Sequence, residues 1–227
     1  MPLFRTRRES TAAELGETAT RASEGGRITA IATTVALLLS AYSLYETAIR
    51  RPELHTFVPP VIRYSSPYTN SNFEVFEVPV TVVNLGARSG TVLSMDLEVT
   101  NLRTKEHKRF IASEVGRWTM DNANAHAMQP FAPLSLPGKS SVSQSVLFYA
   151  LDDEPVQQVA DEKGSYSFKL ALNVAYPEDL GALDRLWPVR SDALVFQMEM
   201  PEIDHRIFIN GTIALHTADW KPSGGGS

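Results

Sequence analysis

The sequence predicts a mainly β protein in which one N-terminal transmembrane helix is followed by an antiparallel β-sandwich. Residues 28–45 form an apolar run without a charged side chain, which is typical of a membrane span. After residue 72 the apolar side chains recur with a period of two, which is the period of half-buried strands. Turn-forming sequences separate these strands, and no long amphipathic pattern follows the apolar run.

The apolar run is bounded by Arg27 and Arg50. As an α-helix, residues 28–49 would be about 33 Å long, enough to cross a hydrocarbon core of about 30 Å. A cleaved signal peptide and a buried helix of a globular domain are the alternatives. The preceding segment, residues 1–27, is long and carries four glutamates, whereas signal peptides begin with a short basic region. The sequence therefore predicts a retained transmembrane helix after a disordered tail.

The arginines beside the predicted span set its expected orientation. Five lie before it and three after it, namely Arg5, Arg7, Arg8, Arg21 and Arg27 against Arg50, Arg51 and Arg63. Cytoplasmic flanks carry the excess of basic residues. We therefore expect a single-pass protein of the bacterial inner membrane, with a cytoplasmic N-terminus and a periplasmic β domain.

Small side chains recur every four residues along the predicted span, at Ala32, Ala36 and Ser40. Such a stripe allows another helix to approach closely in a membrane. The alternative is that Ala, Ser and Thr simply fill a single-pass helix. The stripe is one of two partner-binding surfaces that the sequence suggests.

Composition excludes several classes of function. The net charge is −5, and the basic residues are scattered, so no nucleic-acid-binding surface is expected. The chain has no cysteine, which removes disulfides, thiolate metal sites and cysteine nucleophiles. Hydrophobic residues make up 43%, which is typical of a globular chain.

Clean alternation of apolar and polar residues marks the clearest strands. Residues 73–84, 91–101 and 166–176 alternate, and in the second of these Leu93 and Met95 are expected to share the buried face. Further strands are expected within 54–58, 110–112, 131–136, 140–150, 193–200 and 206–217. The predicted organisation is a juxtamembrane linker with a first strand (50–72), a β-sandwich (73–220) with an insertion (177–192), and a linker-like tail (221–227).

Three short sequences carry a family resemblance: VVNLG (82–86), LPGKS (136–140) and GSYSF (164–168). Their succession resembles that of bacterial immunoglobulin-like domains of the CARDB type, over roughly residues 73–176. The resemblance implies an immunoglobulin-like sandwich and an adhesion, spacer or interaction role. These are turn and packing residues, so it implies no chemistry.

Residues suited to catalysis or metal binding are few. The five histidines show no zinc-enzyme spacing, and no nucleophile motif is present, so we expect neither an enzyme nor a bound cofactor. His126, Met128 and Met120 are ligand types that suit copper, which gives one alternative function, a periplasmic metal- or ligand-carrying module. The structural alternative is a solvated loop histidine beside packing methionines.

The first functional hypothesis is therefore an accessory or assembly subunit of a membrane protein complex. Its partners would be other membrane subunits and the lipid bilayer, in a homo- or hetero-oligomer. The helix stripe and the sandwich loops would supply two contacts whose effects reinforce each other. Tyr64, Tyr68 and Trp118 are the aromatic residues expected to anchor the loop contact.

Overall fold

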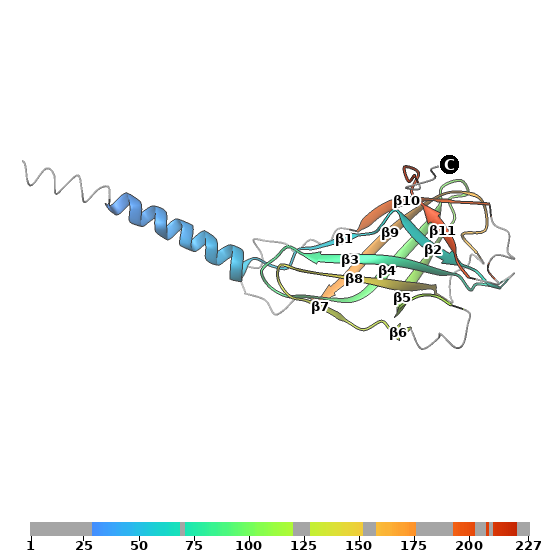
Figure 1. Ribbon diagram of the computed structural model, residues 1–227, viewed down its shortest axis with the longest axis horizontal. Coiled ribbons are helices and arrows are strands. Elements are labelled where there is room, and N and C mark those ends of the chain that lie inside the picture. The colour runs from blue at the N-terminus through green and yellow to red at the C-terminus, as the bar shows by residue number, and fades with distance from the viewer. Residues whose placement is uncertain are drawn as a thin grey trace, which may run out of the picture. The chain divides into compact units, whose positions relative to one another are not determined.

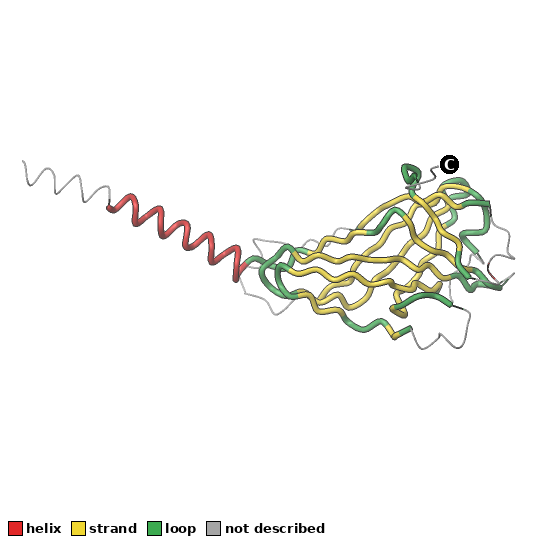
Figure 2. The backbone as a smooth tube through the Cα atoms, in the orientation of Figure 1, coloured by secondary structure: helices red, strands yellow, loops and turns green. Residues whose placement is uncertain are grey.

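The computed structural model describes residues 29–68, 71–119, 128–151, 158–175, 193–202, 208 and 211–221. The chain divides into two compact units, Met1–Ile49 and Arg50–Ser227. The described part of the first unit is an α-helix over residues 29–44, which continues as a π-helical turn, η1, at Tyr45–Ile49. The second unit is built from strands and loops (Figure 2).

The predicted transmembrane helix is wrong. Among the described residues, no helix is both long and apolar enough to cross a membrane. The prediction treated all of 28–49 as one α-helix, but the described α-helical turns cover residues 29–44, about 24 Å at the α-helical rise, before η1 begins. The expected inner-membrane location and the assigned orientation depended on that span, and neither is supported.

Eleven strands are described in the second unit (Figure 1). Their bounds are β1 Leu54–Phe57, β2 Val61–Ser65, β3 Val75–Asn84, β4 Gly90–Asn101, β5 His107–Val115, β6 Gln129–Pro130, β7 Leu134–Leu136, β8 Ser140–Ala150, β9 Gly164–Ala175, β10 Leu194–Met200 and β11 Ile213–His216. The strongly alternating runs of the sequence coincide with β3, β4 and β9. The sequence reading missed β2, which it placed partly in a loop.

Eight of these strands form a closed antiparallel barrel, in the order β5, β8, β3, β2, β11, β10, β9 and β4. The ring closes because β4 also pairs with β5, from Asp96 opposite Ile111 to Thr100 opposite His107. The predicted immunoglobulin-like sandwich is therefore wrong. Alternation shows that a strand has one buried face, but barrels and sandwiches share that pattern, and the difference lies in which strand edges pair.

The barrel interior is filled by side chains from every wall strand. The buried Phe76 contacts three rings edge-on or tilted, those of Tyr64, Phe110 and Phe168, and its ring centroid lies 4.8–5.4 Å from theirs. The register of β4 against β9 shifts between Val92 and Ser94. Because of this bulge Val92 is buried while Leu93 is 44% exposed, so Leu93 does not share the buried face of Met95 as expected.

Two of the three sequences that suggested the CARDB resemblance, VVNLG and LPGKS, meet at one end of the barrel, whereas GSYSF lies in β9 beside the other end of β4. The buried Asn84 amide donates to the carbonyls of Arg88, Leu136 and Pro137, at 2.9–3.2 Å. Its Oδ1 accepts hydrogen bonds from the N–H groups of Glu53 and Gly86. The Asn-x-Gly and Pro-Gly sequences thus fix turns in a closed barrel, so the assignment to an immunoglobulin-like family is wrong.

Candidate functional site

The outer face of β3 and β8 carries an aromatic cluster and a groove. The register places Val75 opposite Tyr149, Glu77 opposite Leu147, Pro79 opposite Ser145 and Thr81 opposite Ser143. Alternate residues of the same strands, such as Val78 and Val146, lie in the barrel core. Val75 and Leu147 are buried although they lie outside that core, so side chains from loops cover this end of the outer face.

The covering side chains form an aromatic cluster of Tyr68, Phe73, Trp118 and Tyr149, which we call the loop-end cluster. Phe73 is its centre, with centroid distances of 5.5 Å to Tyr68, 5.4 Å to Trp118 and 5.9 Å to Tyr149. Tyr68 is 53% exposed, while the other three rings are partly buried. Two loops and the end of β8 therefore converge on one aromatic surface.

The Glu77 side chain, itself buried, fixes the loop that carries Trp118. Glu77 Oε2 accepts a hydrogen bond from the Trp118 backbone N–H at 3.2 Å, and Oε1 accepts one from Ser145 Oγ at 3.3 Å. Arg63 Nη1 lies 3.6 Å from Glu77 Oε1. The carboxylate is thus paired and hydrogen-bonded, which is what a buried charge requires. At the far side of the cluster Tyr149 donates to Glu114, and burial raises the pKa of the Tyr149 phenol.

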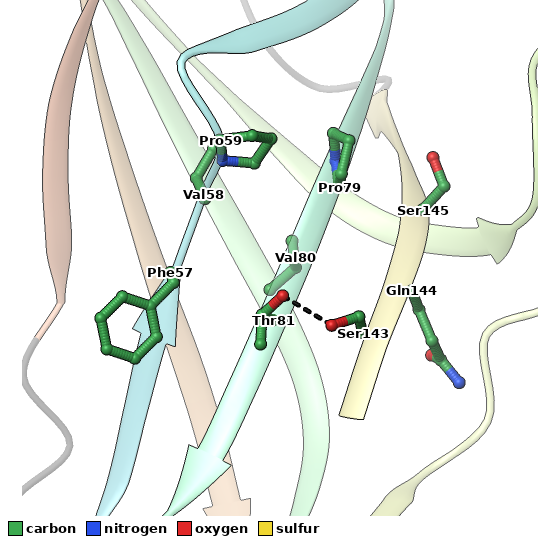
Figure 3. A pocket seen from close by; sticks show the side chains of 9 residues that line it. All are labelled: Phe57, Val58, Pro59, Pro79, Val80, Thr81, Ser143, Gln144 and Ser145. Carbon is green, nitrogen blue, oxygen red and sulfur yellow. Dashed lines mark hydrogen bonds between the residues drawn. The ribbon is translucent and has the colours of Figure 1, made fainter. Parts of the chain in front are cut away.

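Beyond Glu77 the same face is hollowed into a shallow groove of about 510 Å³, here called the outer groove (Figure 3). Strands β1, β3 and β8 and the turn after β1 supply its nine lining residues: Phe57, Val58, Pro59, Pro79, Val80, Thr81, Ser143, Gln144 and Ser145. Phe57 is 58% exposed, and Thr81 Oγ1 and Ser143 Oγ share a hydrogen bond of 2.7 Å across β3 and β8. The groove combines exposed rings with uncharged hydrogen-bonding groups.

A two-residue irregularity between β1 and β2 produces the groove. Both strands pair with β3, but the register changes from Phe57 opposite Thr81 to Arg63 opposite Glu77, so two extra residues lie on the β1–β2 side. The extra chain contains Pro59 and Pro60, which cannot donate to a strand ladder, and Pro79 lies in the β3 segment between the two paired stretches. Prolines on both strands therefore break the pairing there and leave rings on the surface.

None of the nine residues that line the outer groove is an acid, a base or a cysteine. The hydroxyl of one of them, Ser145, donates to the carboxylate of Glu77, which lies outside the lining. The described residues also contain no group of three or more His, Cys, Asp or Glu side chains placed to hold a metal ion.

The predicted partner-binding residues are distributed over different environments. Tyr68 and Trp118 lie in the loop-end cluster, but Tyr64 is buried in the barrel and donates to Glu74 Oε1 at 2.8 Å, so it cannot touch a partner. Ala32, Ala36 and Ser40 are exposed on the helix of residues 29–44, and their helix-packing role stays a prediction. Of the copper candidates, Met128 is partly buried, while Met120 and His126 lie outside the described residues.

Sequence reasoning missed the groove residues Phe57, Pro79, Thr81 and Ser143. Two signals were present. Pro79 interrupts an otherwise regular strand sequence, and Phe57 stands two residues before a Pro-Pro pair. Proline within a strand marks an edge or a bulge. Nothing in the sequence could show that β8 would lie beside this irregularity, because that pairing joins segments about 60 residues apart.

Fold and site together define an antiparallel β-barrel domain with an uncharged groove on its outer face. No protein-family model matches the chain, and no curated protein matches it. One similar solved structure is a crystal structure of an ApaA protein from Bordetella pertussis, at 11% sequence identity and a TM-score of 0.32. The match covers 76% of this chain and 99% of that chain.

Proposed function

We propose that the second unit is a non-enzymatic protein-interaction domain that binds a polypeptide segment of a partner protein in the outer groove. The observation that carries the proposal is the lining of the groove, in which the rings of Phe57, Pro59 and Pro79 lie beside the hydroxyls of Thr81 and Ser143. Peptide grooves combine aromatic and apolar surface with a few polar groups in this way. The absence of charge in the lining favours an uncharged, apolar or proline-containing segment over an acidic or basic one.

The loop-end cluster supports this proposal as a second contact area on the same face. Glu77 links the two areas, because it holds the Trp118 backbone and the Ser145 hydroxyl at once. A partner lying along the outer face of β3 and β8 would contact partly exposed aromatic rings at one end and the groove at the other. Aromatic rings of this kind commonly dominate the energy of protein interfaces.

A displayed-peptide selection followed by affinity measurement tests the proposal. The full chain would be used to select peptides from a random library, and binding of the selected peptides would then be compared for wild type, Ser143→Arg and Ser141→Arg. Ser143 lines the groove; Ser141, on the same strand and also exposed, does not. We expect Ser143→Arg to weaken binding at least about tenfold, or about 1.4 kcal/mol, and Ser141→Arg to leave it unchanged. Equal effects of the two variants, or no enriched peptide, would contradict the proposal.

A further inference from the structure

Strands β1 and β10 each have a backbone edge without a strand partner among the described residues. Strand β1 pairs with β3 alone, from Leu54 opposite Asn84 to Phe57 opposite Thr81. Strand β10 pairs with β9 along its whole length, but with β11 only where Glu199 lies opposite His216. Among the described residues, β11 therefore pairs with β10 only near its end, and no described strand pairs with that edge over residues 194–198.

In the order of the sheet, one strand, β11, separates β2 from β10. Strands β1 and β2 pair in succession with the same side of β3, because β8 pairs with β3 along the other side. Strand β11 lies between β2 and β10. No described strand occupies the equivalent position between β1 and β10. We call this place the strand slot.

The chain itself turns out of the slot immediately after β11. The Thr217 N–H still donates to the Pro60 carbonyl at 3.0 Å, which extends the pairing by one residue. The Trp220 N–H then donates to the Thr217 carbonyl, closing a turn, and the Trp220 ring stacks on His216 with centroids 4.0 Å apart. The residues that would have continued β11 into the slot are held in this turn instead.

The backbone of β1 presents hydrogen-bonding groups to the slot. The Leu85 N–H donates to the Glu53 carbonyl, so Glu53 faces β3. Because backbone groups alternate sides along an antiparallel strand, His55 and Phe57 also face β3, whereas Leu54 and Thr56 direct their N–H and C=O groups into the slot. These are the groups with which an added strand would pair.

The side chains of both edges suit an apolar, uncharged strand. Phe57 and Val195 are 58% and 62% exposed, while Leu194 and Phe196 are only partly buried although they pack against the core. Residues 54–60 and 194–198 contain no Asp, Glu, Lys or Arg. Exposed edges are usually protected by charged residues, prolines or bulges, and β10 has none of these before its last two residues.

We infer that the strand slot binds an extended segment of a partner protein by strand addition. Strand β10 runs in the same direction as β1, since β11 is antiparallel to both β2 and β10. The added segment is antiparallel to β1 and β10, pairs over about four residues, and alternates apolar side chains toward Leu194 and Phe196 with uncharged ones toward Phe57 and Val195. The inference is argued from the backbone edges of β1 and β10 and does not require the outer groove to bind a peptide, although Phe57 lies at both places.

Amide exchange in the full chain, read by NMR, tests the inference with a defined probe. The probe is a capped peptide with the sequence of residues 211–217, GTIALHT, because β11 occupies the corresponding place beside β2. We expect the amides of Leu54 and Thr56 to exchange freely in the isolated chain and to slow at least about tenfold with excess probe. A peptide of the same composition, GTAILHT, breaks the alternation and should give no protection.

Two pairs of variants complete the test. Thr56→Pro removes an N–H that faces the slot, and Val195→Lys places a charge beside it, so each should abolish protection by the probe. Leu93→Lys, a similar change at an exposed apolar residue of β4, should preserve it. His55→Pro, which removes an N–H directed to β3, should instead speed amide exchange in the β1–β3 ladder.

The inference is wrong if the probe gives no protection, or if Val195→Lys and Leu93→Lys behave alike. Protection of Leu54 and Thr56 without probe would also overturn it, showing the slot filled by the chain itself or, where protection depends on concentration, by a second copy.

Discussion

Glu74 and Lys108 form an ion pair that is completely removed from solvent, with 2.7 Å between Glu74 Oε2 and Lys108 Nζ. Glu74 also accepts hydrogen bonds from the Tyr64 hydroxyl and from the N–H groups of Val159 and Ala160. Lys108 donates in addition to the Asn72 carbonyl. One buried carboxylate thus connects β2, β5 and the segment before β9, which fixes loops that are distant in sequence.

Lys108→Met should destabilise the chain strongly. The substitution leaves the Glu74 carboxylate buried without its cation, and breaking a buried pair in this way costs about 3–5 kcal/mol. Urea unfolding measures the change in free energy. The double variant Glu74→Gln, Lys108→Met removes both charges and should be clearly more stable than Lys108→Met alone. A loss under about 1 kcal/mol in the single variant would show that the pair contributes little.

Asn84→Ala should destabilise the chain by about 3 kcal/mol, because the Asn84 side chain makes five hydrogen bonds to backbone groups of three loops. Thermal unfolding checks this expectation. Asn101 is a useful comparison, since its side chain makes three hydrogen bonds, two from the backbone N–H groups of Arg103 and Thr104 and one to the Tyr166 hydroxyl. Asn101→Ala should therefore cost less, and an equal or greater loss would contradict the importance given to Asn84.

Two glycines at the same end of the barrel should not accept a side chain. A Cβ at Gly86 would lie 1.9 Å from the Arg51 carbonyl oxygen, and one at Gly138 would lie 1.9 Å from the Ala87 carbonyl oxygen. Both contacts involve backbone, which must shift, so we expect Gly86→Ala and Gly138→Ala each to cost about 3 kcal/mol in urea unfolding. Gly164→Ala is the control, since nothing lies within 4 Å of its Cβ position, and a similar loss there would contradict the argument.

The sequence predicted individual strands well and their assembly poorly. Alternation located β3, β4 and β9 because it reports the two faces of a single strand. It could not reveal the β4–β5 pairing that closes the barrel, since that depends on edges meeting in space. It also misjudged Leu93, because a bulge exchanges the two faces without leaving a distinct sequence signal.

The candidate site was predictable in part for similar reasons. Loop aromatics pointed to Tyr68 and Trp118, which do meet in one cluster. Tyr64 was wrongly expected to be exposed, because it lies in β2, where its ring fills the core and its hydroxyl reaches the buried Glu74. The helix prediction failed because apolar composition was converted into α-helical length, while the described helix changes to π-helical geometry at Tyr45.

Alkaline pH should destabilise the fold through buried tyrosines. Burial raises the pKa of Tyr166 to about 12, and burial together with the Glu74 carboxylate raises that of Tyr64 well above 10. A phenol with a raised folded pKa binds its proton more tightly when folded. Its stabilising contribution is therefore complete below pH 10, which is the pKa of the phenol in the unfolded chain. For Tyr166 this contribution is lost between pH 10 and about 12.

Urea unfolding across this range should show stability falling with pH. Tyr166→Phe should make the fall shallower while lowering stability at neutral pH, because the hydroxyl bonds to Asn101 and Glu162 are lost. An identical slope in wild type and Tyr166→Phe would rule out Tyr166 as a source of the pH dependence.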